Sequence, residues 1–149
     1  MRRFSSPGLP DLAPQDNSGD LIKGTKGDFK YGQKEFVQNM KKLGAWDHRR
    51  IVVTKGWFKD TATVSAVKHI AFLRLDGDLY SSTYDAIVGF YDRVVHGGLI
   101  YVDDYGSFNG CRDAIDEFRT QRRIHETMHF IRESDGRVEA VWWRKVGSF

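Results

Sequence analysis

The sequence has one cysteine, Cys111, three prolines in 149 residues, and no long apolar run. A single cysteine excludes an internal disulfide and suits a reducing compartment. A membrane-spanning helix needs ~20 consecutive apolar residues, and no stretch approaches that length. The opening MRRFSSPGLP has no apolar centre of the kind found in secretory signals. We therefore expect a cytoplasmic protein that does not associate with membranes.

The composition is that of one globular domain spanning residues 1–149. A hydrophobic fraction of 40% supplies enough apolar surface for a packed core. The net charge is +3, with basic clusters at residues 48–50 and 119–123. No aromatic residues interleave with these clusters, so we interpret them as a strand entrance and a solvated helix face. Nucleic acid is accordingly not an expected partner.

Apolar periodicity predicts alternating helices and strands. Residues 1–28 lack such a period and are expected to be mostly loop. The hairpin at the end is indicated by two alternating segments around the turn sequence SDGR. This order predicts an α/β fold with a mixed, mostly parallel sheet and a C-terminal antiparallel hairpin. The expected helices are 29–43, 61–68, a helix that Ser81 or Ser82 caps and Gly97-Gly98 ends, and 111–123; the expected strands are 50–54, 69–75 (covered on both faces), 99–102, 126–132 and 138–146.

Carboxylates follow two of the predicted strands. Asp76 and Asp78 come after strand 69–75, and Asp103 and Asp104 come after strand 99–102. In a parallel crossover both strand ends lie at the same edge of the sheet, where open α/β sheets bind ligands. Several carboxylates at one edge repel each other unless a positive charge lies between them. A divalent cation is the simplest candidate.

Several sequence blocks resemble one enzyme family. They are KGWFKDT, LRLDGDLYSST, GGLIYVDDYGSFNGCRDAIDEFR and the closing WWRK, with Gly8-Leu9-Pro10 near the start. Together they are similar to the macrocin O-methyltransferases, which methylate sugar hydroxyls of antibiotics with S-adenosylmethionine and magnesium. The resemblance implies a Rossmann-like methyltransferase fold.

The resemblance covers only the later part of that fold. It implies that the strand leading into the glycine-rich cofactor loop has no counterpart here, so the fold is incomplete. The acidic residue that holds the cofactor ribose in such enzymes aligns with Phe4. We therefore expect the isolated chain to bind S-adenosylmethionine poorly and to be inactive.

The resemblance also assigns roles to particular residues. It implies Asp76, Asp103 and Asp104 as magnesium ligands, and hard oxygen ligands of this kind suit Mg²⁺. Asp78 is the candidate general base. Gly56 and Trp57 are candidate cofactor contacts, although Trp57 is equally well explained as an anchor for its loop.

Three further side chains lie near the acidic residues. Arg74 shares a strand face with Asp76. It either orients Asp76 or Asp103 or forms an ordinary buried ion pair, and we favour the ion pair. Tyr80 and Tyr105 either pack against a sugar ring or cover the core.

Two functions remain open. One is an O-methyltransferase, or the C-terminal portion of one, that acts on a sugar or glycoside; the other is an inactive methyltransferase-like remnant that binds a metal or a partner. A metal-dependent hydrolase is less favoured, because no nucleophile or second set of metal ligands accompanies the carboxylates. Association into a homo-oligomer is left open.

Overall fold

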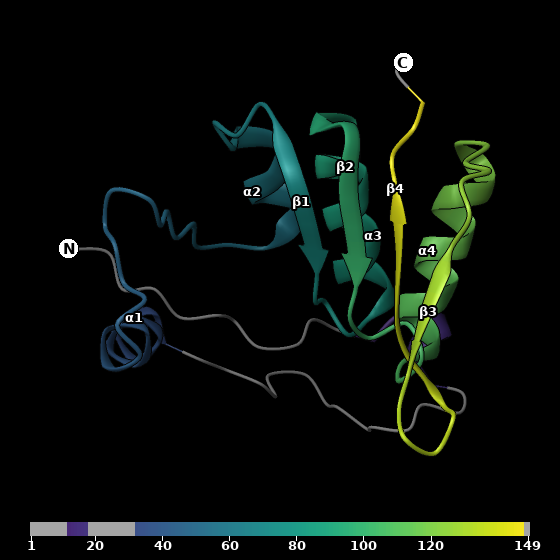
Figure 1. The fold of residues 1–149 in the computed structure, drawn as a ribbon, viewed down its shortest axis with the longest axis horizontal. Helices are drawn as coiled ribbons and strands as arrows, with labels where there is room; N and C mark the ends of the chain where they lie inside the picture. Colours follow the sequence, from purple (N-terminus) through teal and green to yellow (C-terminus); the bar gives the residue numbers. More distant parts are fainter. Residues whose placement is uncertain (1–11, 18–31, 148–149) are drawn as a thin grey trace.

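The computed structural model describes residues 12–17 and 32–147. Figure 1 shows the arrangement of its elements. Within these residues no helix is long and apolar enough to span a membrane. The elements in chain order are the 3-10 helix η1 (Pro14–Asn17), α1 (Gln33–Lys42), α2 (Phe58–Val64), β1 (Ile70–Leu75), α3 (Tyr80–Phe90), the 3-10 helix η2 (Tyr91–Arg93), β2 (Val94–Val102), α4 (Asn109–Gln121), β3 (His129–Arg132) and β4 (Val138–Arg144).

The four strands form one mixed sheet in the order β1-β2-β4-β3. β1 and β2 are parallel, whereas β2–β4 and β3–β4 are antiparallel. The α/β class and the C-terminal hairpin are confirmed. The expectation of a mostly parallel sheet is wrong for these residues, because the predicted strand 50–54 pairs with no described strand. A β-branched run becomes a strand only where a neighbouring backbone pairs with it.

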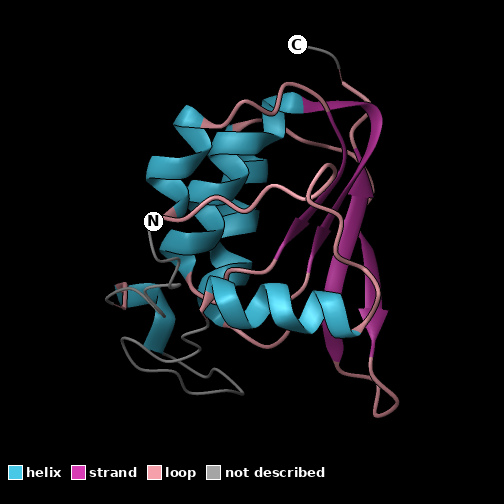
Figure 2. Ribbon diagram, turned by 90° about the vertical axis from the view of Figure 1, so that its left-hand side faces the viewer, coloured by secondary structure: helices cyan, strands magenta, loops and turns pink. Residues whose placement is uncertain are grey.

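The helices α2, α3 and α4 lie side by side on one face of the sheet (Figure 2). Leu73 and Leu75 of β1 point toward this layer and are buried, whereas Phe72 on the other face is 56% exposed. The expectation that residues 69–75 are covered on both faces is therefore wrong. β1 is an edge strand of the described sheet, and one of its faces packs against helices.

The core lies between this sheet face and the helices. Its largest fully buried side chain is Trp143 of β4, which packs with Ile100 of β2 and Ile115 of α4 in one apolar cluster. The contact between α2 and α3 depends on a glycine. A Cβ at Gly89 would lie 2.3 Å from the Cβ of Ala62, so any larger residue there would push the two helices apart.

The helix after the acidic loop ends earlier than Gly97-Gly98, where the sequence predicted its end. α3 stops at Phe90, η2 follows, and β2 starts at Val94. The buried ammonium group of Lys145 donates to the carbonyl oxygens of Tyr91 (3.1 Å) and Val94 (3.0 Å). This tertiary contact ties the turn between α3 and β2 to the residue that follows β4, and it adds to the hydrogen bond that the Tyr91 carbonyl oxygen accepts from the Val94 N–H. The local sequence gave no indication of it.

The two neighbouring tryptophans of β4 provide a test of this sheet orientation. We expect Trp143→Ala to lower the free energy of unfolding by about 3–5 kcal/mol, because it empties the centre of the core. Trp142→Ala should cost much less, since Trp142 is on the opposite face and is not fully buried. Urea unfolding followed by circular dichroism measures both changes. Equal losses for the two variants would contradict the assignment of faces.

Candidate functional site

The predicted carboxylates lie at the ends of two adjacent strands. Leu75 of β1 is in register with Val102 of β2, so both strands end at the same level. The backbone N–H of Asp103 donates to the carbonyl oxygen of Leu75 (2.9 Å), which extends the contact past the ends of the strands. The loop carrying Asp76 and the loop carrying Asp104 are therefore neighbours, as the parallel crossover predicted.

Three of the four carboxylates converge on one point. Asp76, Asp78 and Asp104 each offer an oxygen, and these oxygens all lie within 4.8 Å of one another. This set of hard oxygen donors fits a single divalent cation. Asp78 also has a positive φ of 54°, a conformation that is costly for a residue other than glycine. The fold therefore holds this loop in a strained conformation that points the carboxylate into the group.

The crowding changes the protonation of the group. Burial, followed by repulsion from Asp78, raises the pKa of Asp104 to about 7. The backbone N–H of Asp78 donates to Asp104 (3.2 Å) and only partly offsets this effect. The pKa of Asp78 is also raised, first by burial and then by the charges of Asp76 and Asp103. A cation at this point would remove the repulsion.

Asp103 lies outside this group of three and faces Arg74 instead. A guanidinium nitrogen of Arg74 is 2.5 Å from a carboxylate oxygen of Asp103, and a second nitrogen binds Asp76. The hydroxyl of Tyr101 donates to the other oxygen of Asp103 (2.9 Å). The Arg74 side chain is 47% exposed, so the expectation of a buried ion pair is wrong. Arg74 bridges and orients two carboxylates.

The buried carboxylate of Asp16 caps the helix that follows the loop carrying Asp76 and Asp78. The sequence analysis missed this contact. Asp16 is 4% exposed and accepts a hydrogen bond of 2.7 Å from the backbone N–H of Tyr80, the first residue of α3. A Cβ at Gly110 would lie 1.9 Å from the same oxygen, so α4 approaches closely only because it has glycine there. The prediction that Ser81 or Ser82 caps this helix is wrong, because no residue near α3 in sequence provides a side-chain cap. Asp16 is 64 residues away, and no local pattern could have indicated it.

The candidate cofactor residues lie at the start of α2. Trp57 is the half-buried residue preceding α2, and Gly56 has a φ of 142°, which favours glycine. The next residue, Phe58, lines a cavity of about 250 Å³ together with Asp76 and Gly77. Phe58 therefore reaches the acidic end of β1, whereas Gly56 and Trp57 do not line this cavity. Phe4, the expected counterpart of the ribose ligand, lies outside the described residues.

The remaining candidates near the site have structural contacts. Tyr105 is 7% exposed and donates to Asp116 (2.8 Å), so it covers the core. Tyr80 stacks on Tyr84 with ring centres 5.7 Å apart. Burial raises the pKa of the Cys111 thiol to about 12, which keeps it protonated and unreactive.

The sequence profile of a family described as macrocin-O-methyltransferase (TylF) matches residues 4–145. The chain belongs to this family. The resemblance noted from the sequence blocks is therefore confirmed.

Curated O-methyltransferases align with most of this chain. The demethyldecarbamoylnovobiocin O-methyltransferase of Streptomyces niveus is 32% identical over 145 residues, which are 95% of this chain and 53% of that protein. An 8-demethyl-8-(2,3-dimethoxy-alpha-L-rhamnosyl)-tetracenomycin-C 4'-O-methyltransferase of Streptomyces olivaceus is 38% identical over 110 residues, 74% of this chain and 40% of that protein. The chain thus spans about half the length, or less, of these relatives.

The solved structure of the O-methyltransferase NovP has the same fold over the shared region. It superposes with a TM-score of 0.80 at 30% sequence identity, covering 95% of this chain and 57% of the NovP chain. The α/β arrangement with a mixed sheet is therefore that of a methyltransferase structure.

The raised pKa of Asp104 predicts a pH dependence of stability when divalent cations are chelated. The folded protein keeps this proton up to about pH 7, whereas an unfolded aspartate loses it near pH 4. The unfolded state binds fewer protons between these values, so stability should fall as pH rises from 4 to 7. Urea unfolding in EDTA should show a smaller fall for Asp104→Asn. The same pH dependence in parent and variant would contradict the raised pKa.

Proposed function

We propose that this chain supplies the metal- and acceptor-binding part of an O-methyltransferase that uses S-adenosylmethionine and Mg²⁺. The observation that carries the proposal is the convergence of Asp76, Asp78 and Asp104 at the ends of β1 and β2, in a member of a methyltransferase family. We propose a sugar hydroxyl as the acceptor. The relative from Streptomyces olivaceus, whose name specifies a substrate with a rhamnosyl group, supports this choice.

In this proposal Asp76, Asp103 and Asp104 hold the magnesium ion. When bound, Mg²⁺ would act as a Lewis acid that lowers the pKa of the acceptor hydroxyl. Arg74 now neutralises Asp76 and Asp103, so it must give up part of this contact when a cation takes its place. The observed group offers a second ligand set, in which Asp78 replaces Asp103. Experiment can separate the two sets.

Asp78 is proposed to accept the proton of the hydroxyl. Its pKa is raised by burial and by neighbouring carboxylates, which makes it a stronger base than an ordinary aspartate. Its strained backbone and its backbone hydrogen bond to Asp104 fix its position beside the ligands. Gly56 and Trp57 are proposed to contact S-adenosylmethionine, which supplies the methyl group.

An inactive protein that binds a metal or a partner is the second candidate. It is supported by the short span of the chain, about half of the relative from Streptomyces niveus. The two candidates differ in turnover. Either protein could bind Mg²⁺ through the carboxylates, but only the methyltransferase requires Asp78 to act as a base.

The ligand assignment predicts the effect of single substitutions on Mg²⁺ affinity. Asp103→Asn and Asp104→Asn should each weaken binding by at least about tenfold, because each removes a charged oxygen donor. Asp92→Asn, in an exposed ion pair with Arg122, is the control and should bind as the parent does. Isothermal titration calorimetry on the full chain measures these affinities. Unchanged binding by Asp103→Asn, with loss in Asp78→Asn, would select the second ligand set.

The role of Asp78 predicts a loss of rate. We expect Asp78→Asn to lower methyl transfer by about 10²–10⁴-fold while Mg²⁺ affinity stays close to that of the parent, because asparagine cannot accept the proton. The rate is measured in a hybrid in which this chain replaces the matched part of the Streptomyces niveus relative. A normal rate at saturating Mg²⁺ would exclude Asp78 as the base. A folded parent hybrid that binds Mg²⁺ without transferring methyl groups would favour the inactive protein.

A further inference from the structure

Arg74 forms ion pairs with two carboxylates of the site. Its Nη1 atom contacts Asp76, and its Nη2 atom lies 2.5 Å from Oδ2 of Asp103. Both aspartates belong to the proposed set of magnesium ligands. A positive charge of the protein itself therefore already lies against two of the ligands that Mg²⁺ would use.

Asp103 is held at both of its carboxylate oxygens. Arg74 binds Oδ2, and the hydroxyl of Tyr101 donates to Oδ1 (2.9 Å). Asp103 is not among the three carboxylates whose oxygens converge. It can join them on a cation only if one of its two contacts breaks. Loss of the Arg74 contact is the change that would free Asp103 and Asp76 together.

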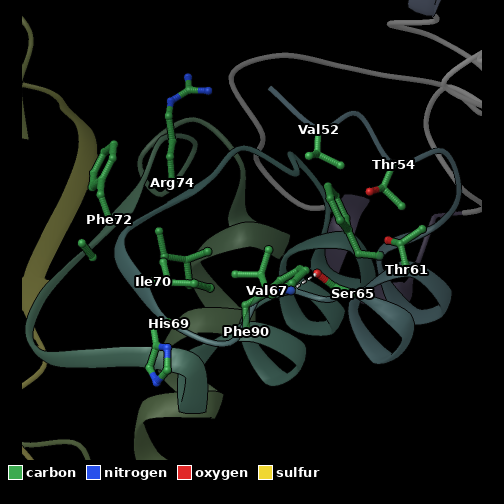
Figure 3. A pocket seen from close by; sticks show the side chains of 13 residues that line it. Val52, Thr54, Thr61, Ser65, Val67, His69, Ile70, Phe72, Arg74 and Phe90 are labelled. Atoms are coloured by element: carbon green, nitrogen blue, oxygen red, sulfur yellow. Dashed lines mark hydrogen bonds between the residues drawn. The ribbon is translucent and has the colours of Figure 1, made fainter. Parts of the chain in front are cut away.

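The Arg74 side chain is placed to move. It is 47% exposed and lies on the sheet face opposite the helices with Phe72, which is 56% exposed. Figure 3 shows it extending away from Ile70 and Phe90, two residues that line a cavity of about 570 Å³ beside β1. Ion pairs that are this exposed contribute little to stability, since water screens them. A divalent cation can therefore replace Arg74 at Asp103 without unpacking the core.

We propose that Arg74 is an exchangeable cation of the protein: it neutralises Asp76 and Asp103 when no metal is bound, and it swings toward solvent when Mg²⁺ binds, which releases Asp103 to the metal. Arg74 is thus a positioning residue that acts through the ligands and does not touch the reacting atoms. The inference rests on the proposed Mg²⁺ site and is independent of methyl transfer.

The exchange connects the two ligand sets that the site offers. With Arg74 in place, Asp76, Asp78 and Asp104 are the carboxylates that face one another. After Arg74 leaves, Asp103 becomes available in place of Asp78, which leaves Asp78 free of the metal. The exchange also sets the Mg²⁺ affinity, because the incoming ion must compete with a positive charge that already binds two ligands.

Two substitutions of Arg74 test the competition, with Mg²⁺ affinity measured by isothermal titration calorimetry on the full chain. Arg74→Gln should bind Mg²⁺ at least about fivefold more tightly, because the competing charge is gone. Arg74→Lys keeps a positive charge and should stay within about twofold of the parent. Arg122→Gln is the matched control, since Arg122 forms an ion pair of similar exposure (39%) with Asp92 and should leave the affinity unchanged. If Arg74 only held the ligands in place, Arg74→Gln would weaken binding instead.

Nuclear magnetic resonance of the parent chain follows the movement directly. The side-chain Nε–Hε signal of Arg74 should shift when Mg²⁺ is added, because its carboxylate partners are lost. The signal of Arg122 should not shift. This measurement needs no variant, so it does not depend on whether the substituted chains fold.

The outcomes separate this inference from the proposed function. A parent chain that binds no Mg²⁺ would overturn the metal site and the exchange with it. Where Mg²⁺ binds, an unshifted Arg74 signal, or weaker binding by folded Arg74→Gln, would overturn the exchange and leave the metal site in place. A chain without methyl transfer that binds Mg²⁺ with a shifted Arg74 signal would support the exchange and count against the proposed enzyme.

Discussion

Electrostatic repulsion among carboxylates at the ends of β1 and β2 is the constraint on which the site depends. Oxygens of Asp76, Asp78 and Asp104 lie within 4.8 Å of each other, and burial holds the pKa of Asp104 near 7. Arg74 neutralises the outer part of the cluster, where it binds Asp76 and Asp103. Among the described residues, no arginine or lysine forms such an ion pair with Asp78 or Asp104. The fold thus maintains an arrangement in which carboxylates repel one another, and a bound cation would remove this repulsion.

Contacts distant in sequence keep this arrangement in place. Asp16 caps α3 from the N-terminal side and fixes the start of the helix that follows the acidic loop. Lys145, at the other end of the chain, holds the turn between α3 and β2. Both side chains are buried, and both bind backbone groups of distant elements. The geometry of the acidic loops is therefore set by the whole described fold.

The described residues cover only one face of the sheet with helices. β1 is at an edge, and Phe72 is exposed beside it. The acidic site lies at the end of that edge strand, where β1 and β2 finish at the same level.

The sequence by itself determined the features that depend on local pattern. Apolar periodicity predicted β1, α3, α4 and the hairpin, and the position of carboxylates after two buried strands predicted that they would meet. Tertiary structure alone decided which carboxylates converge, because the left-handed backbone of Asp78 and the bridge from Arg74 turn Asp78 inward and Asp103 aside. It also decided that residues 51–54 form no strand and that Asp16 caps α3. These outcomes depend on contacts between groups that are far apart in the sequence. No local pattern of residue types in a single sequence indicates which of these groups will meet.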